Sequence, residues 1–179
     1  MAEIKRLRRD LVANGVIFDY CQDTMLLPNG KEVKWDIIVH HGAAAVVPVL
    51  DDGRIVMVRQ YRNAMERYTW EIPAGGLNDK GAEPTDVAAI RELAEETGYR
   101  TDKVELLIRF VTSVAYSTEH IDIYVARNLK PGTQHLDPDE FVEVKAFDLQ
   151  ELVDMIYNYE IEDSKTIAAI MAYKDKFAM

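Results

Sequence analysis

Short apolar segments, several of them alternating with polar residues, fill the first fifty positions and predict β-strands. Residues 16–21 and 24–27 are short and apolar, and residues 28–30, Pro-Asn-Gly, follow them as a turn. Residues 32–41 alternate apolar with polar side chains, which is typical of a strand with one buried face. Residues 43–50 are almost continuously apolar, which indicates a strand buried on both faces.

The rest of the chain mixes further strands with amphipathic helices. Asp51-Asp52-Gly53 predicts a hairpin turn after the apolar strand. Asp148 with Glu151 forms a capping-box pattern that predicts a helix, and a last helix starts near Ser164. Because strands and helices interleave without regular βαβ alternation, we expect an α/β fold with a mixed β-sheet between helical layers. The further strands are expected at 54–62, 68–73, 104–112, 120–126 and 141–147.

A helix between Pro84 and Gly98 carries the chemistry that organises the chain. Pro84 suits the first helical turn, and Gly98 suits a left-handed C-terminal cap. At about 100° per residue, one side of this helix is an apolar stripe. The stripe consists of Ile90, Leu93, Ala94 and Thr97.

Three carboxylates share the other side of the same helix. Glu92 and Glu96 lie one turn apart, and Glu95 lies beside them. Arg91 can pair with Glu95 four residues on, but no other base in the helix serves Glu92 and Glu96. A hard divalent cation bound through oxygen is their natural partner, and an ordinary solvated acidic helix is the alternative interpretation.

The segment 76–99 resembles a Nudix box, G-x5-E-x7-R-E-U-x-E-E-x-G-U, in which U is an aliphatic or aromatic residue. The matching residues are Glu83, Arg91, Glu92, Leu93, Glu95, Glu96, Gly98 and Tyr99. One departure is that six residues, not five, separate Gly76 from Glu83, and an extra loop residue costs little closure entropy. The resemblance implies a Nudix-type α/β/α sandwich, here with a small N-terminal antiparallel strand extension.

Composition sets the limits on partners and location. A chain of 179 residues suits one compact domain, with a small N-terminal extension. The resemblance implies a Nudix hydrolase domain at 43–179 and a strand extension at 1–42 for dimerisation and substrate binding. The net charge of −10 argues against a nucleic-acid partner. The single cysteine, Cys21, fits a reducing cytoplasm. No apolar run approaches the ~18 residues of a membrane span, and we expect neither a membrane partner nor a signal peptide.

Motifs outside the box resemble the ADP-ribose pyrophosphatase branch of the family. They are residues 70–75 (WEIPAG), 58–62 (VRQYR), 139–144 (DEFVEV) and the strand group that ends at Trp35-Asp36. This resemblance implies hydrolysis of ADP-ribose to AMP and ribose 5-phosphate. Another ADP-sugar or a GDP-sugar is the main alternative substrate, because Val114-Ala115 replaces the Pro-Gly common in this branch. A non-catalytic nucleotide sensor is the other alternative.

The predicted metal is Mg²⁺, with Mn²⁺ as an alternative ion. Magnesium keeps open positions for water and phosphate oxygens beside one or two carboxylates. Glu92 and Glu96 are the catalytic metal ligands, and Glu95 is a further ligand or a partner of Arg91. The resemblance implies that the backbone carbonyl of Ala74 completes the set. Glu83 is expected to support the site from outside the metal's own ligands.

The general base must come from elsewhere if the box glutamates bind metal. The resemblance points to Glu140, in the loop before the last strand, while a solvated loop is the ordinary interpretation of this acidic segment. Asp137 and Asp139 are the alternatives to Glu140 for this role. Glu119 is a second candidate in a different loop, which we expect to border the same substrate-binding cleft.

Substrate recognition requires an aromatic surface and a phosphate-binding cation. The resemblance favours Trp35 for adenine stacking and Asp36 for the adenine amine, although Trp35 shares a strand face with apolar residues and could be core instead. Arg62 is the best phosphate-binding arginine, because its guanidinium can bind two oxygens. Glu71 is expected to form hydrogen bonds within the site. An N-terminal strand group too small for its own core predicts a homodimer.

Overall fold

The computed structural model describes residues 3–136, 138 and 140–177, which form two compact units. The first unit contains the described residues up to Gly42 together with Val111–His120. The second contains Ala43–Phe110 and the described residues from Ile121 onward. The functional division into 1–42 and 43–179 stays a prediction.

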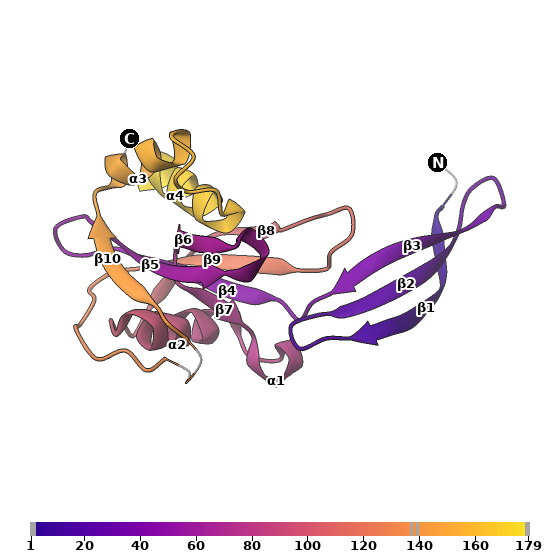
Figure 1. The fold of residues 1–179 in the computed structure, drawn as a ribbon, viewed down its shortest axis with the longest axis horizontal. Helices are drawn as coiled ribbons and strands as arrows, with labels where there is room; N and C mark the ends of the chain where they lie inside the picture. The colour runs from indigo at the N-terminus through magenta and orange to yellow at the C-terminus, as the bar shows by residue number, and fades with distance from the viewer. Residues whose placement is uncertain (1–2, 137, 139, 178–179) are drawn as a thin grey trace. The chain divides into compact units, whose positions relative to one another are not determined.

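The first unit is built on a three-stranded antiparallel sheet. Its strands, visible in Figure 1, are β1 (Lys5–Asn14), β2 (Asp19–Leu26) and β3 (Glu32–Val39), in the order β1-β2-β3. The prediction of two strands at 16–21 and 24–27 was wrong, because one continuous strand runs through Gln22 and Asp23. Asp23 is tolerated there because Arg9 on β1 binds both of its carboxylate oxygens at 2.7 Å, which lowers the pKa of Asp23.

Strand β1 was not predicted at all. Nearly all of its side chains are exposed, so its sequence lacks the alternation that identifies a strand with one buried face. Its pairing with β2 includes two irregularities of register, between Arg6 and Arg8 and between Leu11 and Ala13. Such bulges further obscure the two-residue period in the sequence.

The second unit contains two sheets. The four-stranded sheet has the order β7-β4-β9-β8, and the three-stranded sheet has the order β10-β5-β6. Strand β4 pairs parallel with β9 and antiparallel with β7, so the predicted mixed sheet is confirmed. The strands are β4 (Ala43–Pro48), β5 (Ile55–Arg62), β6 (Arg67–Glu71), β7 (Ala74–Gly76), β8 (Val104–Val111), β9 (His120–Ala126) and β10 (Glu143–Phe147).

The expected hairpin between β4 and β5 is not formed. The turn at residues 51–53 is present, but β5 pairs with β10 and β6, and β4 lies in the other sheet. A single bridge between Val49 and Ile55 is what connects the two segments. Both segments are apolar enough to be central strands, and each is paired on both sides: β4 with β7 and β9, and β5 with β6 and β10.

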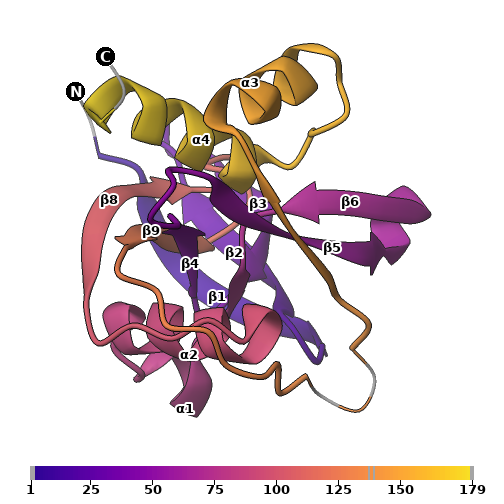
Figure 2. The same ribbon diagram turned by 90° about the vertical axis from the view of Figure 1, so that its left-hand side faces the viewer.

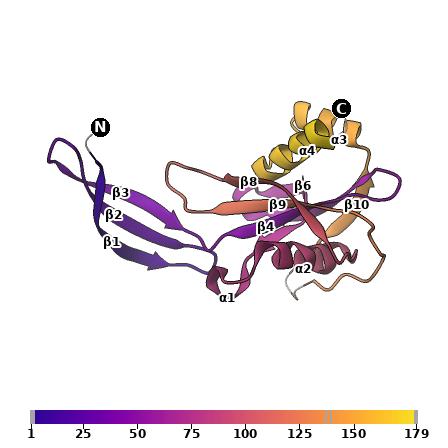
Figure 3. The ribbon, with the colours of Figure 1, turned by 180° about the vertical axis from the view of Figure 1, so that it is seen from behind.

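Helices cover this unit from two sides. Figure 2 shows α3 and α4 on one side of the strands and α2 on the opposite side, and Figure 3 shows the same layers from behind. The β4 side chains alternate accordingly: Ala44 and Val46 pack with Leu93 of α2, whereas Ala45 and Val47 join the core beneath α3 and α4. The helices are α1 (Asn78–Gly81), α2 (Thr85–Thr97), α3 (Leu149–Tyr157) and α4 (Ser164–Phe177), with a short 3₁₀ turn at Asn63–Met65.

Some of the predicted helix ends are present in the structure. Pro84 precedes α2, and Gly98 ends it with φ of 75° while its N–H donates to the carbonyl of Ala94 at 3.0 Å. Asp148 precedes α3, but its side chain makes no capping hydrogen bond, so the predicted capping box is not formed. Of the helices that the structure describes, none has the length and apolar character of a membrane span.

Replacing Gly98 by alanine should destabilise the second unit in two ways. The left-handed conformation disfavours any Cβ by about 1–2 kcal/mol. A Cβ here would also lie 2.9 Å from the backbone nitrogen of Gln134 and 3.0 Å from the oxygen of Gly132. Gly53→Ala is the matched control, because Gly53 has φ of 87° but open space around it.

We expect Gly98→Ala to lower the free energy of unfolding by at least about 1 kcal/mol more than Gly53→Ala, since overpacking adds to backbone strain. Urea denaturation followed by circular dichroism measures both variants. Equal losses would mean that the segment around Gly132 and Gln134 moves aside without cost.

Candidate active site

Helix α2 buries two of the three predicted metal carboxylates. Glu92 is 9% and Glu96 4% exposed, whereas Glu95 is partly exposed. The opposite side of the helix is anchored by Leu93, which is fully buried. Glu92 and Glu96 therefore lie against protein, where a carboxylate loses most of its hydration.

Strand β7 comes unusually close to these carboxylates. A Cβ added at Gly75 would overlap the Glu92 carboxylate, so any other residue here would displace that carboxylate from its present position. One residue earlier, the N–H of Ala74 donates to Glu96 Oε2 at 3.0 Å. The predicted contact of the Ala74 carbonyl with a metal ion stays a prediction.

Burial changes the protonation of both carboxylates. It raises the pKa of Glu92 to about 6, where the charges of Glu95 and Glu140 add to the effect and Arg91 opposes it. It raises the pKa of Glu96 to about 8, with the hydrogen bond from Ala74 and the charge of Lys165 in opposition. Each folded pKa lies above the ordinary carboxyl value, so ionising these groups at neutral pH opposes folding unless a cation compensates.

Arg91 ties the acidic residues of α2 to the preceding loop. Its Nη1 donates to Glu92 at 2.5 Å and to Glu95 at 2.9 Å. Its Nε and Nη2 bind the two oxygens of Glu83 at 3.0 and 2.9 Å, and Nη2 also donates to the carbonyl of Gly76. Glu83 in turn accepts from the N–H of Asn78 at 2.9 Å, which closes the loop that contains the extra residue.

A cavity of about 350 Å³ opens beside these groups. Glu140, the predicted general base, lines it together with Glu92 and Glu95. His135 also lines it, and the His135 N–H donates to the Glu95 carbonyl at 3.0 Å. His135 carries no spacing signal in the sequence, because its position depends on contacts that residues 134 and 135 make with the end of α2. Asp137 and Asp139 lie outside the described residues.

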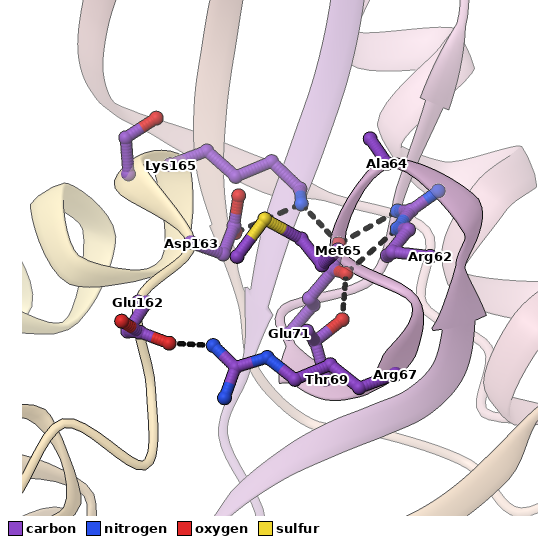
Figure 4. A pocket seen from close by; sticks show the side chains of 10 residues that line it. Arg62, Ala64, Met65, Arg67, Thr69, Glu71, Glu162, Asp163 and Lys165 are labelled. Atoms are coloured by element: carbon purple, nitrogen blue, oxygen red, sulfur yellow. Dashed lines mark hydrogen bonds and ion pairs between the residues drawn. The ribbon is translucent and has the colours of Figure 1, made fainter.

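A second cavity, of about 380 Å³, contains Arg62 and Glu71 (Figure 4). Arg62 binds Glu71 through two hydrogen bonds, Nε to Oε1 at 2.7 Å and Nη2 to Oε2 at 2.6 Å. Lys165, at the start of α4, binds the same carboxylate. Burial alone would raise the pKa of Glu71, but the hydrogen bonds from Arg62 and the charge of Lys165 outweigh it and lower this pKa to about 2.

The remaining predicted substrate residues belong to the first unit. Trp35 is 43% exposed, so it is not a core residue of that unit. Asp36 accepts hydrogen bonds from Tyr20 at 2.7 Å and from Gln22 at 3.2 Å. Glu119 accepts one from Thr112 at 2.8 Å. Their place at the substrate stays a prediction.

A family model described as a NUDIX domain matches residues 39–170, which is most of the chain. The chain belongs to the Nudix family. The predicted resemblance is therefore confirmed at the level of the family.

Two relatives and one solved structure are similar to the chain over nearly its whole length. An "ADP-ribose pyrophosphatase" of Bacillus subtilis is 38% identical over 99% of this chain and 96% of its own length. A "Methanol dehydrogenase activator" of Bacillus methanolicus is 41% identical over 94% of this chain and 91% of its own. A crystal structure of an "ADP compounds hydrolase" has a TM-score of 0.85 and 21% identity, and the match covers 97% of this chain and 93% of that one. This likeness confirms the predicted Nudix fold.

The Nudix helix of this chain suits a divalent cation chemically. Glu92 and Glu96 offer hard oxygen ligands that burial leaves short of compensating charge, and Gly75 clears the space beside them. In the conformation described, Arg91 binds an oxygen of Glu92 and one of Glu95. Among the described residues, no three His, Cys, Asp or Glu side chains are arranged to hold an ion. A cation at these oxygens would therefore compete with Arg91.

The low pKa of Glu71 makes a prediction about stability and pH. Because its folded pKa of about 2 lies below the ordinary 4.5, its contribution is present above pH 4.5 and is lost as pH falls toward 2. Between pH 6 and pH 3 this loss amounts to about 2 kcal/mol. Urea unfolding of the parent and of Glu71→Gln at both pH values measures it.

The parent should lose about 2 kcal/mol more than Glu71→Gln over this interval. Glu143→Gln, which removes an exposed carboxylate paired with Arg59, is the control and should follow the parent. An identical pH dependence in the parent and in Glu71→Gln would contradict the assignment of a strongly ionised Glu71.

Proposed function

We propose that this chain hydrolyses the diphosphate bond of ADP-ribose to give AMP and ribose 5-phosphate, with Mg²⁺ as the metal and Mn²⁺ as an alternative. The observation that carries the chemistry is the pair of buried carboxylates, Glu92 and Glu96, on the Nudix helix beside Gly75. The choice of substrate follows the B. subtilis relative, which matches nearly the whole chain.

Four carboxylates and one arginine divide the chemical work. Glu92 and Glu96, with Glu95 and the carbonyl of Ala74, would hold the metal. When bound, the ion would neutralise charge on the diphosphate and make a water molecule more acidic. Glu140 lines the same cavity as Glu92 and takes the proton of the attacking water. Arg62 donates to a phosphate oxygen.

Trp35, Asp36 and Glu119 are the further substrate-binding residues in this proposal. The exposed ring of Trp35 is free to stack on adenine, and Asp36 and Glu119 offer hydrogen-bond acceptors. Buried Cys21 needs no oxidising compartment, which is compatible with the cytoplasm as the proposed location.

The direct test is AMP release from ADP-ribose by the purified chain with Mg²⁺, compared across other ADP-sugars and GDP-sugars by kcat/KM. The proposal expects the highest value for ADP-ribose. A higher value for another sugar would reassign the substrate within the same chemistry. No AMP from any of them would overturn the proposal and make the B. methanolicus relative the better guide to function.

Glu96→Gln is the matched control for this assay. Glutamine is nearly isosteric with the protonated carboxyl that a pKa of about 8 favours, so the metal-free variant should fold as the parent does. Turnover should fall at least about a hundredfold, because even outer partners of metal ligands are worth ten- to hundredfold. Mg²⁺ should raise the melting temperature of the parent but not of Glu96→Gln. Retained turnover would move the metal site elsewhere.

We also propose a homodimer formed through the first unit. Among the described residues of this unit, Cys21 is the only buried apolar side chain, so the sheet has almost no core of its own. Large apolar residues are exposed on and beside β1 instead, among them Ile4, Leu7, Leu11, Ile17 and Phe18. An apolar surface of this kind usually marks an interface, and a second copy of the same sheet has matching chemistry.

Light scattering at micromolar concentration should give twice the chain mass of 20.4 kDa. The double variant Leu7→Glu and Leu11→Glu should shift the mass to that of one chain, because it places charges in the apolar surface. Tyr157→Glu, at an exposed position of α3, is the control and should remain dimeric. A monomeric parent would contradict the proposal.

A further inference from the structure

Lys165 is a buried lysine at the start of α4, only 8% exposed. Lysine is rarely buried unless it is paired, because removing an ammonium group from water costs several kcal/mol. Here Lys165 Nζ binds Glu71 and also Asp163 Oδ2, the latter at 2.9 Å. The sequence motifs assign no role to this lysine.

The carboxylate that Lys165 reaches has all of its acceptor positions in use. Glu71 Oε1 accepts from Arg62 Nε at 2.7 Å and from the Thr69 hydroxyl at 2.6 Å. Its Oε2 accepts from Arg62 Nη2 at 2.6 Å and from Lys165 Nζ. A carboxylate offers about four lone-pair sites, so this network leaves Glu71 no free position for a metal ion or a sugar hydroxyl. Glu71 can therefore affect substrate binding only through the residues that it binds.

The first turn of α4 fixes Lys165 relative to Glu71. Asp163 Oδ2 accepts from Lys165 and also from the backbone N–H and hydroxyl of Thr166, at 3.0 and 2.6 Å. The Thr166 hydroxyl in turn accepts from the N–H of Ile72, the residue after Glu71, at 3.0 Å. The end of β6 is thus attached to α4 at two adjacent residues, and the ammonium group has little freedom to move away.

Charge explains why a second cation is needed beside Glu71. Without Lys165, Arg62 would be the only cation paired with this buried carboxylate, and much of its own charge would be neutralised. Figure 4 shows Arg62 and Lys165 both bound to Glu71, so the negative charge of this carboxylate is shared between two cations. Arg62 meets Glu71 through its Nε–Nη2 edge, so its Nη1 edge points away from that carboxylate. Its side chain is 42% exposed at the cavity.

We propose that Lys165 is a positioning residue: it shares the charge of Glu71 and holds that carboxylate in place, so that Glu71 orients Arg62 toward the diphosphate of the substrate. This inference rests on the proposed function, in which Arg62 binds a phosphate oxygen. It adds the start of α4, through Asp163, Lys165 and Thr166, to the elements that set substrate affinity. Lys165 itself makes no contact with substrate in this scheme.

A double-mutant cycle between Lys165 and Arg62 tests the inference. Lys165→Met, Arg62→Ala and the double variant are compared by KM and kcat for ADP-ribose. Their Kd values are measured by calorimetry for the analogue in which a methylene group replaces the bridging oxygen. Lys165→Met should raise KM and Kd about tenfold and change kcat less than about threefold, a coupling usual within one network. In the Arg62→Ala background, it should change neither constant more than about twofold.

Conservative and control variants separate positioning from stability. Lys165→Arg keeps the charge and should bring KM back to within about threefold of the parent. Lys176→Met removes an exposed lysine of the same helix, paired with Glu105, and should match the parent. If thermal denaturation shows that Lys165→Met does not fold, Lys165→Gln takes its place in the same cycle.

The outcomes distinguish this inference from the proposed function. Equal losses from Lys165→Met in both backgrounds, or parent-like constants, would overturn the role of Lys165 while leaving ADP-ribose hydrolysis intact. A parent that binds the methylene analogue without hydrolysing ADP-ribose would overturn the proposed reaction, and the cycle in Kd alone would still decide the role of Lys165. A parent that neither binds nor hydrolyses would overturn both.

Discussion

The close approach of strand β7 to helix α2 is the constraint on which the rest of the site depends. Gly75 leaves the space that the Glu92 carboxylate occupies, and the Ala74 N–H holds Glu96. The two carboxylates thereby lose water and come to share a small volume with like charges nearby, which raises the pKa of each. Such a site is costly for a protein alone and becomes favourable when a cation is bound.

Two networks of charged side chains in the second unit support this arrangement. Arg91 spans Glu83, Glu92 and Glu95, and so connects the loop after β7 to the helix. In the second network, Glu71 binds both Arg62 and Lys165. The charge of Lys165 also lowers the pKa of Glu96, which opposes the effect of burial on that carboxylate. Removing Arg91 or Lys165 would leave a buried carboxylate with fewer cationic partners.

The sequence was sufficient for the parts that depend on local order. The register of the carboxylates on α2 and the cap at Gly98 follow from spacing and turn chemistry, and the mixed sheet follows from the irregular order of strands and helices. The structure contains all three. The burial of Glu92 and Glu96 could not be predicted in the same way. A helical wheel places acidic residues on one face but says nothing of which strand covers that face.

The features that the sequence did not predict also depend on contacts between distant segments. Strand β1 was missed because its side chains are exposed on both faces, and its pairing depends on contacts such as Arg9 with Asp23. No role could be predicted for Lys165 from the sequence, because the role depends on its contact with Glu71, which is 94 positions away. Glu71 itself was predicted as a site residue because it is an acidic residue in an apolar strand. The hydrogen bonds that occupy both of its carboxylate oxygens come from three separate segments and could not be predicted.

The central claim is that Glu92 and Glu96 hold a divalent cation against a diphosphate, and a single crystallographic measurement tests it most directly. Crystals soaked with Mn²⁺ and the methylene analogue of ADP-ribose would reveal the ion by anomalous scattering. The account predicts an anomalous peak about 2.1 Å from oxygens of Glu92 and Glu96, with Arg91 displaced from Glu92. A peak remote from α2, with both carboxylates still contacting only protein, would contradict it.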